Sequence, residues 1–262
     1  MSEQLSATVL SDIHGRVERV KPVVYAEYDR TGLFVFNGDT VDGTEVKQLI
    51  DFIISLGDKA VSLLGNHEWV LRNALRFDER DPQIEHEHKA WIHDVWSPRS
   101  GRRYEVGMLE SYGVTRTNNA ETNARALLAA MEEAGHKQWL DSLRPYAEFD
   151  DFVAVHAGPN LQDDWETQAG NISIFDDPKM RLSQQPDQLF NDKLAEPHAI
   201  PQHVSRKKFI TGHVHLDLPA EERRQDRHIT LASSLRKGHP LFVWRSATDE
   251  IVAYAPDGSV VK

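Results

Sequence analysis

Short apolar runs and amphipathic segments alternate over the first 65 residues. Residues 7–10, 33–36 and 60–64 are apolar runs with the length and β-rich composition of buried strands. Between them, residues 17–30 and 44–56 place Val, Leu and Ile at helical spacing. The order strand, helix, strand, helix, strand predicts a parallel sheet with right-handed crossovers.

The pattern changes after the third predicted strand. Residues 69 to about 145 are charged and helical in character, without a convincing strand. We interpret them as a helical insertion over the strand ends that shapes substrate access; a solvated helical cap without substrate contact is the alternative. Residues 159–204 are rich in Pro, Asp, Gln and Asn, and we expect a long functional or mobile loop there.

Strand patterns return in the second half of the chain. Residues 152–155 and 208–210 are apolar runs, and residues 229–232, 241–244 and 251–254 are expected to close the fold as antiparallel strands. No linker, repeat or low-complexity tract divides the sequence. We therefore expect an α/β fold in a single domain over residues 1–262, with the insertion at about 69–145.

Composition narrows the classes of function. The formal net charge of −11 argues against non-specific binding to nucleic acids or membrane surfaces. No stretch approaches the roughly 18 apolar residues of a membrane span, and the segment Met1-Ser2-Glu3-Gln4 does not resemble a signal peptide. We expect a cytoplasmic protein. Because Cys is absent, a metal site must use His, Asp or Asn, which suits Mn, Fe, Zn or Mg.

Side chains of the metal-binding type follow five of the predicted strands. They are Asp12 and His14, Asp39 and Asp42, Asn66 and His67, His156, and His213 and His215. A single His at a strand end is more often structural, but five such units in one α/β chain predict a metal site where strand ends converge. In an extended segment residues i and i+2 point the same way, so Asp12 and His14 could bind one ion together. His213 and His215 could be divided between two ions if their loop turns.

The short motifs around these residues resemble, as a set, those of a known protein family. The segments Asp12-Ile13-His14-Gly15, Gly38-Asp39-Thr40-Val41-Asp42-Gly43, Gly65-Asn66-His67-Glu68, His156-Ala157-Gly158 and Gly212-His213-Val214-His215 look like those of the calcineurin-like metallophosphoesterase superfamily. Their order matches across residues 12–215, and the forms at 66–68 and 156–158 resemble its phosphoprotein phosphatase branch. That branch includes Ser/Thr phosphatases and bacterial diadenosine tetraphosphate hydrolases. The resemblance implies a four-layer α/β/β/α sandwich.

The resemblance also implies roles for the residues. Two divalent ions, most simply Mn²⁺, would activate a hydroxide that attacks phosphorus. The implied ligands are Asp12, His14 and His215 for the first ion, Asn66, His156 and His213 for the second, and Asp39 for both. Asn66 would also contact substrate. His67 would be the general acid, oriented by Asp42; the alternative for Asp42 is a turn residue that binds backbone amides. No chemical role is evident for Glu68.

One position departs from the family pattern. The phosphatase branch usually has a phosphate-clamping Arg directly after the second Asp of the bridging motif, and here Gly43 stands there. Arg72 and Arg181 are candidate replacements, together with the cluster Arg99, Arg102 and Arg103, although each could be an ordinary surface Arg. Without a clamp the site could also accept diesters.

Three functions compete. The leading one is a dimetal phosphatase acting on phosphomonoesters, such as phosphoserine or phosphothreonine in proteins. The second is hydrolysis of a dinucleoside polyphosphate such as diadenosine tetraphosphate, with Trp91 or Trp96 as stacking residues, or a permissive phosphodiesterase activity. The third is a non-catalytic binding protein that keeps the fold, which the complete set of candidate ligands disfavours. The oligomeric state is left open.

Overall fold

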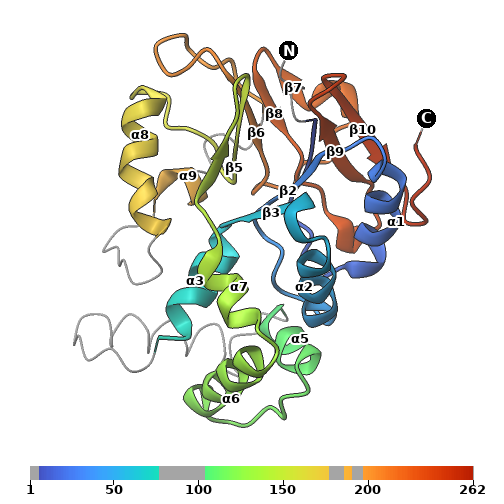
Figure 1. Cartoon of the computed structure of the whole chain (residues 1–262), viewed down its shortest axis with the longest axis vertical. Coiled ribbons are helices and arrows are strands. Elements are labelled where there is room, and N and C mark those ends of the chain that lie inside the picture. The colour runs from blue at the N-terminus through green and yellow to red at the C-terminus, as the bar shows by residue number, and fades with distance from the viewer. Residues whose placement is uncertain (1–5, 77–103, 177–185, 191–196, 262) are drawn as a thin grey trace.

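The computed structural model describes residues 6–76, 104–176, 186–190 and 197–261, and its centre is a pair of five-stranded sheets (Figure 1). The first sheet has the order β10-β9-β1-β2-β3. Its strands are β1 (Ala7–Leu10), β2 (Leu33–Asn37), β3 (Ala60–Leu63), β9 (Leu241–Arg245) and β10 (Glu250–Tyr254). The pairs β1–β2 and β2–β3 are parallel, and β9 and β10 pair antiparallel, as the sequence predicts.

The second sheet has the order β4-β5-β6-β8-β7. Its strands are β4 (Tyr146–Glu148), β5 (Phe152–Val155), β6 (Lys208–Thr211), β7 (Arg224–Gln225) and β8 (His228–Thr230). The expectation that the strand near residue 229 is antiparallel is wrong in part. β8 pairs antiparallel with β7 but parallel with β6. The reason is that β7 runs opposite to β6, and the chain reverses again in the turn between β7 and β8.

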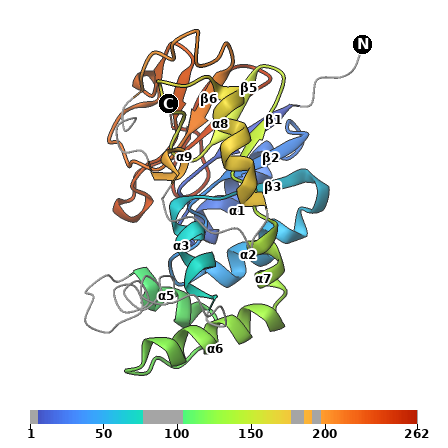
Figure 2. The ribbon, with the colours of Figure 1, turned by 90° about the vertical axis from the view of Figure 1, so that its left-hand side faces the viewer.

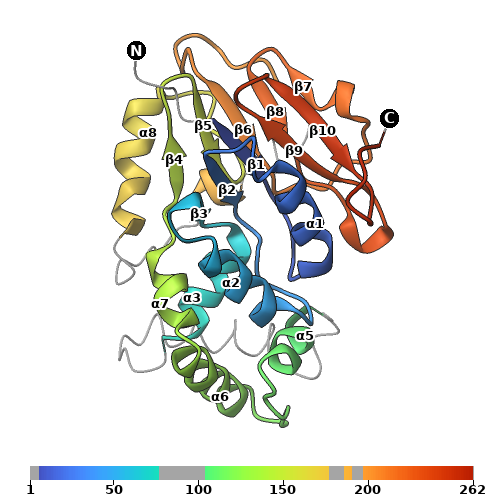
Figure 3. The same ribbon diagram turned by 45° about the vertical axis from the view of Figure 1, so that its right-hand side comes forward.

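Helices cover both outer faces and complete four layers (Figure 3). Along β2, Phe34 and Phe36 pack against α1 (Val17–Glu27) and α2 (Val46–Ser55), whereas Val35 faces the second sheet. On the other side, Trp165 of α8 (Trp165–Ile172) packs on Phe209 of β6 with ring centroids 5.1 Å apart. The α/β/β/α sandwich is therefore confirmed, and the alternation of side chains along the strands explains it.

The described part of residues 69–145 is helical and gathers at one end of the molecule (Figure 2). It comprises the end of α3 (Asn66–Ala74), then α5 (Tyr104–Ser111), α6 (Ala120–Glu133) and α7 (His136–Ser142). Whether it shapes substrate access stays a prediction. Among the described residues, no helix is long and apolar enough to cross a membrane.

The segment 159–204 is not one long loop. It contains α8, a 3₁₀ turn (Ser173–Asp176) and α9 (Asp187–Phe190). Asp164 begins α8 by accepting the Thr167 N–H at 2.8 Å, and Trp165, Ala169 and Ile172 bury one helical face. The polar composition of the segment hid this short amphipathic pattern.

Candidate metal centre

The loops after β1 and β2 run side by side and bring their acidic residues together. The N–H groups of Asp12, His14 and Gly15 donate to the carbonyls of Gly38, Asp39 and Thr40 at 3.2, 2.9 and 2.8 Å. These bonds continue the parallel pairing of the two strands beyond their ends. The aligned loops place Asp12 and Asp39 at the carboxyl edge of the first sheet, where α/β folds bind ligands.

The loops are sharply turned. Among the described residues, seven that are not glycine have a positive φ, and five of these are candidate site residues. The five are Asp12, His14, Asp39, Asp42 and His213. The expected extended geometry at Asp12 and His14 is therefore wrong, because their φ angles are 57° and 48°. Sparsely populated backbone conformations of this kind persist where surrounding contacts fix them, and they cluster at functional sites.

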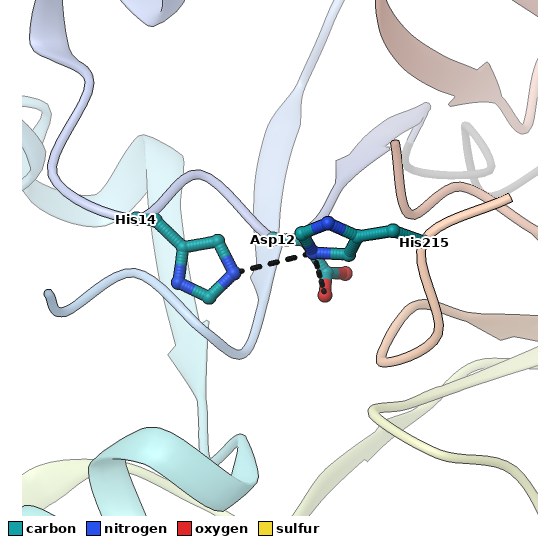
Figure 4. Close-up of side chains that lie close together, drawn as sticks. All are labelled: Asp12, His14 and His215. Atoms are coloured by element: carbon teal, nitrogen blue, oxygen red, sulfur yellow. Dashed lines mark hydrogen bonds and ion pairs between the residues drawn. The ribbon is translucent and has the colours of Figure 1, made fainter. Parts of the chain in front are cut away.

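The first group of donor atoms comes from Asp12, His14 and His215, as Figure 4 shows. The His215 Nε2 atom lies 3.4 Å from His14 Nε2 and 3.6 Å from Asp12 Oδ1. Asp12 is fully buried, and His215 reaches it from the loop after β6. The structure thus brings together the three residues expected for one ion.

The second group comes from Asp39, His156 and His213, with Asn66 beside it. The Asn66 Oδ1 atom lies 3.0 Å from His156 Nε2 and 3.0 Å from His213 Nδ1. Turning the amide over would point its nitrogen at the same rings and at Asp39. The oxygen-inward orientation is the one that a cation requires, because oxygen and ring nitrogen lone pairs then converge on it.

Asp39 lies between the two groups. Its Oδ1 is 3.3 Å from His156 Nε2, and its Oδ2 is 3.9 Å from His14 Nε2. The loop that contains His213 turns at a φ of 71°, so His213 and His215 join different groups. This set of imidazole, carboxylate and amide donors fits two divalent cations of the Mn, Fe or Zn type.

The protonation of His156 supports this fit. Its Nδ1 lies 3.0 Å from the Asn37 carbonyl, which only accepts, so Nδ1 carries a proton and Nε2 faces Asp39. Burial lowers the pKa of His156, but the Asp39 carboxylate outweighs it and raises that pKa to about 9. A proton at Nε2 therefore competes with a metal ion for the same atom, as expected of a metal-binding imidazole.

The buried carboxylates of the centre are held in their ionised form. Burial raises the pKa of Asp39 and of Asp12, but nearby imidazoles outweigh this effect and hold both values below the usual range. Asp12 also accepts the Ser11 hydroxyl at 2.6 Å and the His213 N–H at 3.1 Å. Ionised, buried carboxylates need cations or hydrogen-bond donors, and two divalent ions would supply that positive charge in place of the imidazole protons.

Glu68 has a role that sequence reasoning missed. Its side chain is fully buried and accepts four backbone N–H groups. The donors are Asp39 at 2.8 Å, Thr40 at 2.6 Å, Val41 at 2.8 Å and Gly65 at 2.9 Å. The signal was available: Glu three residues after a helix N-cap commonly binds the cap N–H.

His67 lies at the start of α3 and faces Asp42. Its Nδ1 contacts Asp42 Oδ2 in a close ion pair, and its Nε2 lies 3.6 Å from Asp39 Oδ2. Burial lowers the pKa of His67, but Asp39 and Asp42 outweigh it and raise that pKa well above its usual value. The imidazole remains 31% exposed, so it can meet a ligand from outside.

Gly43 cannot be replaced by the usual Arg without rearranging the site. Its φ is 116°, and a Cβ there would lie 2.6 Å from the His14 carbonyl oxygen. A Cβ on Gly107 of α5 would in turn lie 2.7 Å from the Gly43 carbonyl carbon. The missing side chain therefore permits close packing of the His14 loop and α5 around Gly43.

The expectation that Arg72 binds substrate is wrong. Arg72 is 3% exposed, and its guanidinium donates to the Phe175, Leu140, Asp141 and Leu143 carbonyls at 2.7–3.4 Å. It ties α3 to the end of α7 and cannot also bind a phosphate. Arg181, the Arg99–Arg103 cluster, Trp91 and Trp96 lie outside the described residues.

Comparisons with known proteins identify the family of the chain. The family model of the calcineurin-like phosphoesterases matches residues 5–217. The chain belongs to the calcineurin-like phosphoesterase family. Like other members, this calcineurin-like phosphoesterase is expected to act on phosphoester bonds with the help of metal ions. A search of curated proteins gives no match.

Solved structures show the same fold. A cold-active protein-tyrosine phosphatase from a psychrophilic Shewanella species has a TM-score of 0.51 at 15% identity, with 98% of this chain and 80% of that one covered. A protein assigned as a diadenosine tetraphosphatase has a TM-score of 0.54 at 15% identity, with 97% and 95% covered. At such low identity, these likenesses establish the fold of this calcineurin-like phosphoesterase and leave its substrate open.

Proposed function

We propose that the protein hydrolyses phosphomonoesters with two divalent metal ions. The observation that carries this proposal is the position of Asp39, whose two carboxylate oxygens face different donor groups, toward His156 on one side and His14 on the other. A carboxylate in that position can bind two ions at once. Mn²⁺ is the proposed metal, with Fe, Zn and Mg as alternatives, because every donor is nitrogen or oxygen.

Each donor group would hold one ion. Asp12, His14 and His215 would bind the first, Asn66, His156 and His213 the second, and Asp39 both. Bound divalent ions activate water and neutralise charge on phosphoryl oxygens. The protein contributes the geometry: the loop pairing and the Glu68 bonds hold the donors in place before substrate arrives. Asn66 is proposed to contact substrate as well.

His67 is proposed as the proton donor to the leaving group. Its ring is held by Asp42 through Nδ1, and its Nε2 faces the donor groups, 3.6 Å from Asp39 Oδ2. A positioned imidazole of this kind protonates a leaving alkoxide as its bond to phosphorus breaks. Asp42 orients the ring and keeps the proton on it.

A second candidate is hydrolysis of a dinucleoside polyphosphate such as diadenosine tetraphosphate, at a phosphoanhydride bond, or of phosphodiesters by a permissive site. The observation that favours it is Gly43, where the packing leaves no room for an Arg side chain that would favour the dianionic terminal phosphate of a monoester. The two structural neighbours named above carry descriptions from both classes, a protein phosphatase and a diadenosine tetraphosphatase.

The test is hydrolysis by metal-stripped protein to which Mn²⁺ is returned. The substrates are p-nitrophenyl phosphate, bis-p-nitrophenyl phosphate and diadenosine tetraphosphate. Turnover of the monoester alone, restored by metal, supports the phosphatase and leads to phosphoserine and phosphothreonine peptides. Turnover of the diester or the dinucleotide at a higher kcat/KM supports the second candidate. Absence of turnover with every metal and substrate would contradict both.

A further inference from the structure

The loop after β6 carries one donor for each group, His213 and His215, yet residues 212–219 form no helix or strand. The His215 side chain is 35% exposed, so packing around the ring does not fix it. Its position must be set by the backbone on either side.

The first end of this loop is firmly held. The Gly212 N–H donates to the His156 carbonyl at 2.7 Å, and the His213 N–H donates to the Asp12 carboxylate at 3.1 Å. A Cβ on Gly212 would lie 1.9 Å from Ser11 Oγ, so the backbone passes directly over the Asp12 loop. These contacts fix the residues that precede His215 in the sequence, and they leave the residues that follow it unfixed.

Arg223 holds the second end. Its side chain is 1% exposed and carries a guanidinium that donates to four carbonyls. Two of these carbonyls lie in the loop, Leu216 at 2.7 Å and Leu218 at 3.0 Å. The other two are Thr230, the last residue of β8, at 3.5 Å, and Ala232 just after it at 2.8 Å. The backbone bond between the same two segments, from the Leu216 N–H to the Ala232 carbonyl, is long at 3.4 Å. The guanidinium is therefore the main tie between the His215 loop and β8.

The guanidinium is itself rigidly held. Its central carbon lies 3.7 Å from the centroid of the Phe242 ring on β9. Burial lowers the pKa of Arg223 to about 10, and Asp12 opposes that effect. No carboxylate is among its hydrogen-bond partners in the described part of the chain. Burying a cation this way is costly, and an apolar residue would pack at lower cost if only the core mattered.

We propose that Arg223 is a positioning residue for the metal centre, which sets His215 against Asp12 and His14 by fixing the carbonyls of Leu216 and Leu218. This inference rests on the proposed two-metal function. A flat guanidinium with donors on three nitrogens can bind both segments at fixed angles, whereas a Lys ammonium cannot reproduce that fork. Substitutions should therefore weaken metal binding more than they disturb the fold.

The test is calorimetric titration of metal-stripped protein with Mn²⁺. The variants are Arg223→Lys and Arg223→Met, and the matched control is Arg224→Met. The neighbouring Arg224 points away from the loop, to Asp249 at 2.8 Å. We expect the Arg223 variants to raise the Kd of one Mn²⁺ ion by about 10- to 100-fold, the usual effect of losing a group that orients a ligand. Arg224→Met should leave both Kd values unchanged.

A double-mutant cycle with His215→Ala separates positioning from general destabilisation. If Arg223 acts through His215, Arg223→Lys should change the Mn²⁺ Kd little once His215 is absent. At saturating Mn²⁺, the KM of Arg223→Lys for p-nitrophenyl phosphate should stay within about threefold of wild type, since only metal affinity is lost. Additive effects of the two substitutions would overturn the proposal.

Mn²⁺ binding to the wild-type protein distinguishes a failure of the role given to Arg223 from a failure of the proposed function. If wild type binds two Mn²⁺ ions and both Arg223 variants bind them equally well, the role of Arg223 is refuted while the proposed function stands. If wild type binds no Mn²⁺, the proposed function fails, and the inference fails with it. Arg223→Lys keeps the charge and most of the volume, so it serves where Arg223→Met does not fold.

Discussion

The Glu68 carboxylate accepts the backbone N–H of Asp39 at 2.8 Å, which couples the start of α3 to the residue between the two donor groups. The same carboxylate binds Gly65, directly before Asn66 and His67. Two segments that each supply candidate site residues are thus fixed by one buried side chain. Burial raises the pKa of Glu68, and its hydrogen bonds to the Val41 and Gly65 N–H groups oppose that effect.

Glu68→Gln should destabilise the protein by about 2–4 kcal/mol. Each carboxylate oxygen accepts two N–H groups, so an amide nitrogen in place of either one leaves two buried donors without acceptors. Urea unfolding measures the loss. The control is Glu121→Gln, an exposed residue paired with Arg125 on α6, which should change stability by less than about 0.5 kcal/mol. Equal effects of the two substitutions would refute the role given to Glu68.

Asp39→Asn should abolish turnover, by at least about a thousand-fold in kcat, because a neutral amide cannot bind two cations with two anionic oxygens. Asp226→Asn is the matched control: its φ of 52° equals that of Asp39, and it lies in a turn between β7 and β8. Asn tolerates this conformation in both places. Turnover of p-nitrophenyl phosphate by both variants is the measurement. Retained activity in Asp39→Asn would exclude the two-metal arrangement.

His67→Ala should discriminate between leaving groups. Alkyl phosphates leave as strong bases and need a proton, so their kcat should fall by about 10²- to 10³-fold. Aryl phosphates such as p-nitrophenyl phosphate should lose only a few-fold. Asp42→Asn should show the same trend to a smaller extent, since it only orients the ring. A parallel loss for both substrate types would mean that His67 is not the proton donor.

Much of this site could be predicted from local sequence. Asp12, Asp39 and His156 directly follow or lie close behind short apolar strands, and parallel strands deliver such residues to one edge. The sequence pattern at residues 12–14 predicted an extended backbone, which is wrong. The turned backbone at Asp12 and His14 depends on hydrogen bonds to the loop after β2. Local sequence carries no record of such partners.

The contacts of buried charged residues were harder to predict from the sequence. Glu68 and Arg72 bind backbone groups far along the chain, and Arg223 binds carbonyls on both sides of a turn nearby; backbone partners of this kind have no side-chain signature. Arg72 was expected to reach substrate, yet it lies three residues after the buried Trp69, on the same face of α3. That spacing was a clue to burial, and the carbonyls that make burial of Arg72 tolerable could only be seen in the fold.

The packing at Gly43 leads to a last prediction. Gly43→Ala adds two costs: a φ of 116°, beyond the left-handed region that other residues can adopt, worth about 1–3 kcal/mol, and a clash with the His14 carbonyl, worth about 1–3 kcal/mol more. Gly57→Ala carries only the smaller cost of the left-handed region, about 1–2 kcal/mol, because its φ is 55° and a Cβ there meets nothing within 4 Å. Urea unfolding of both variants should therefore show the greater loss at Gly43. Equal losses would mean that the His14 carbonyl does not exclude a side chain at this position.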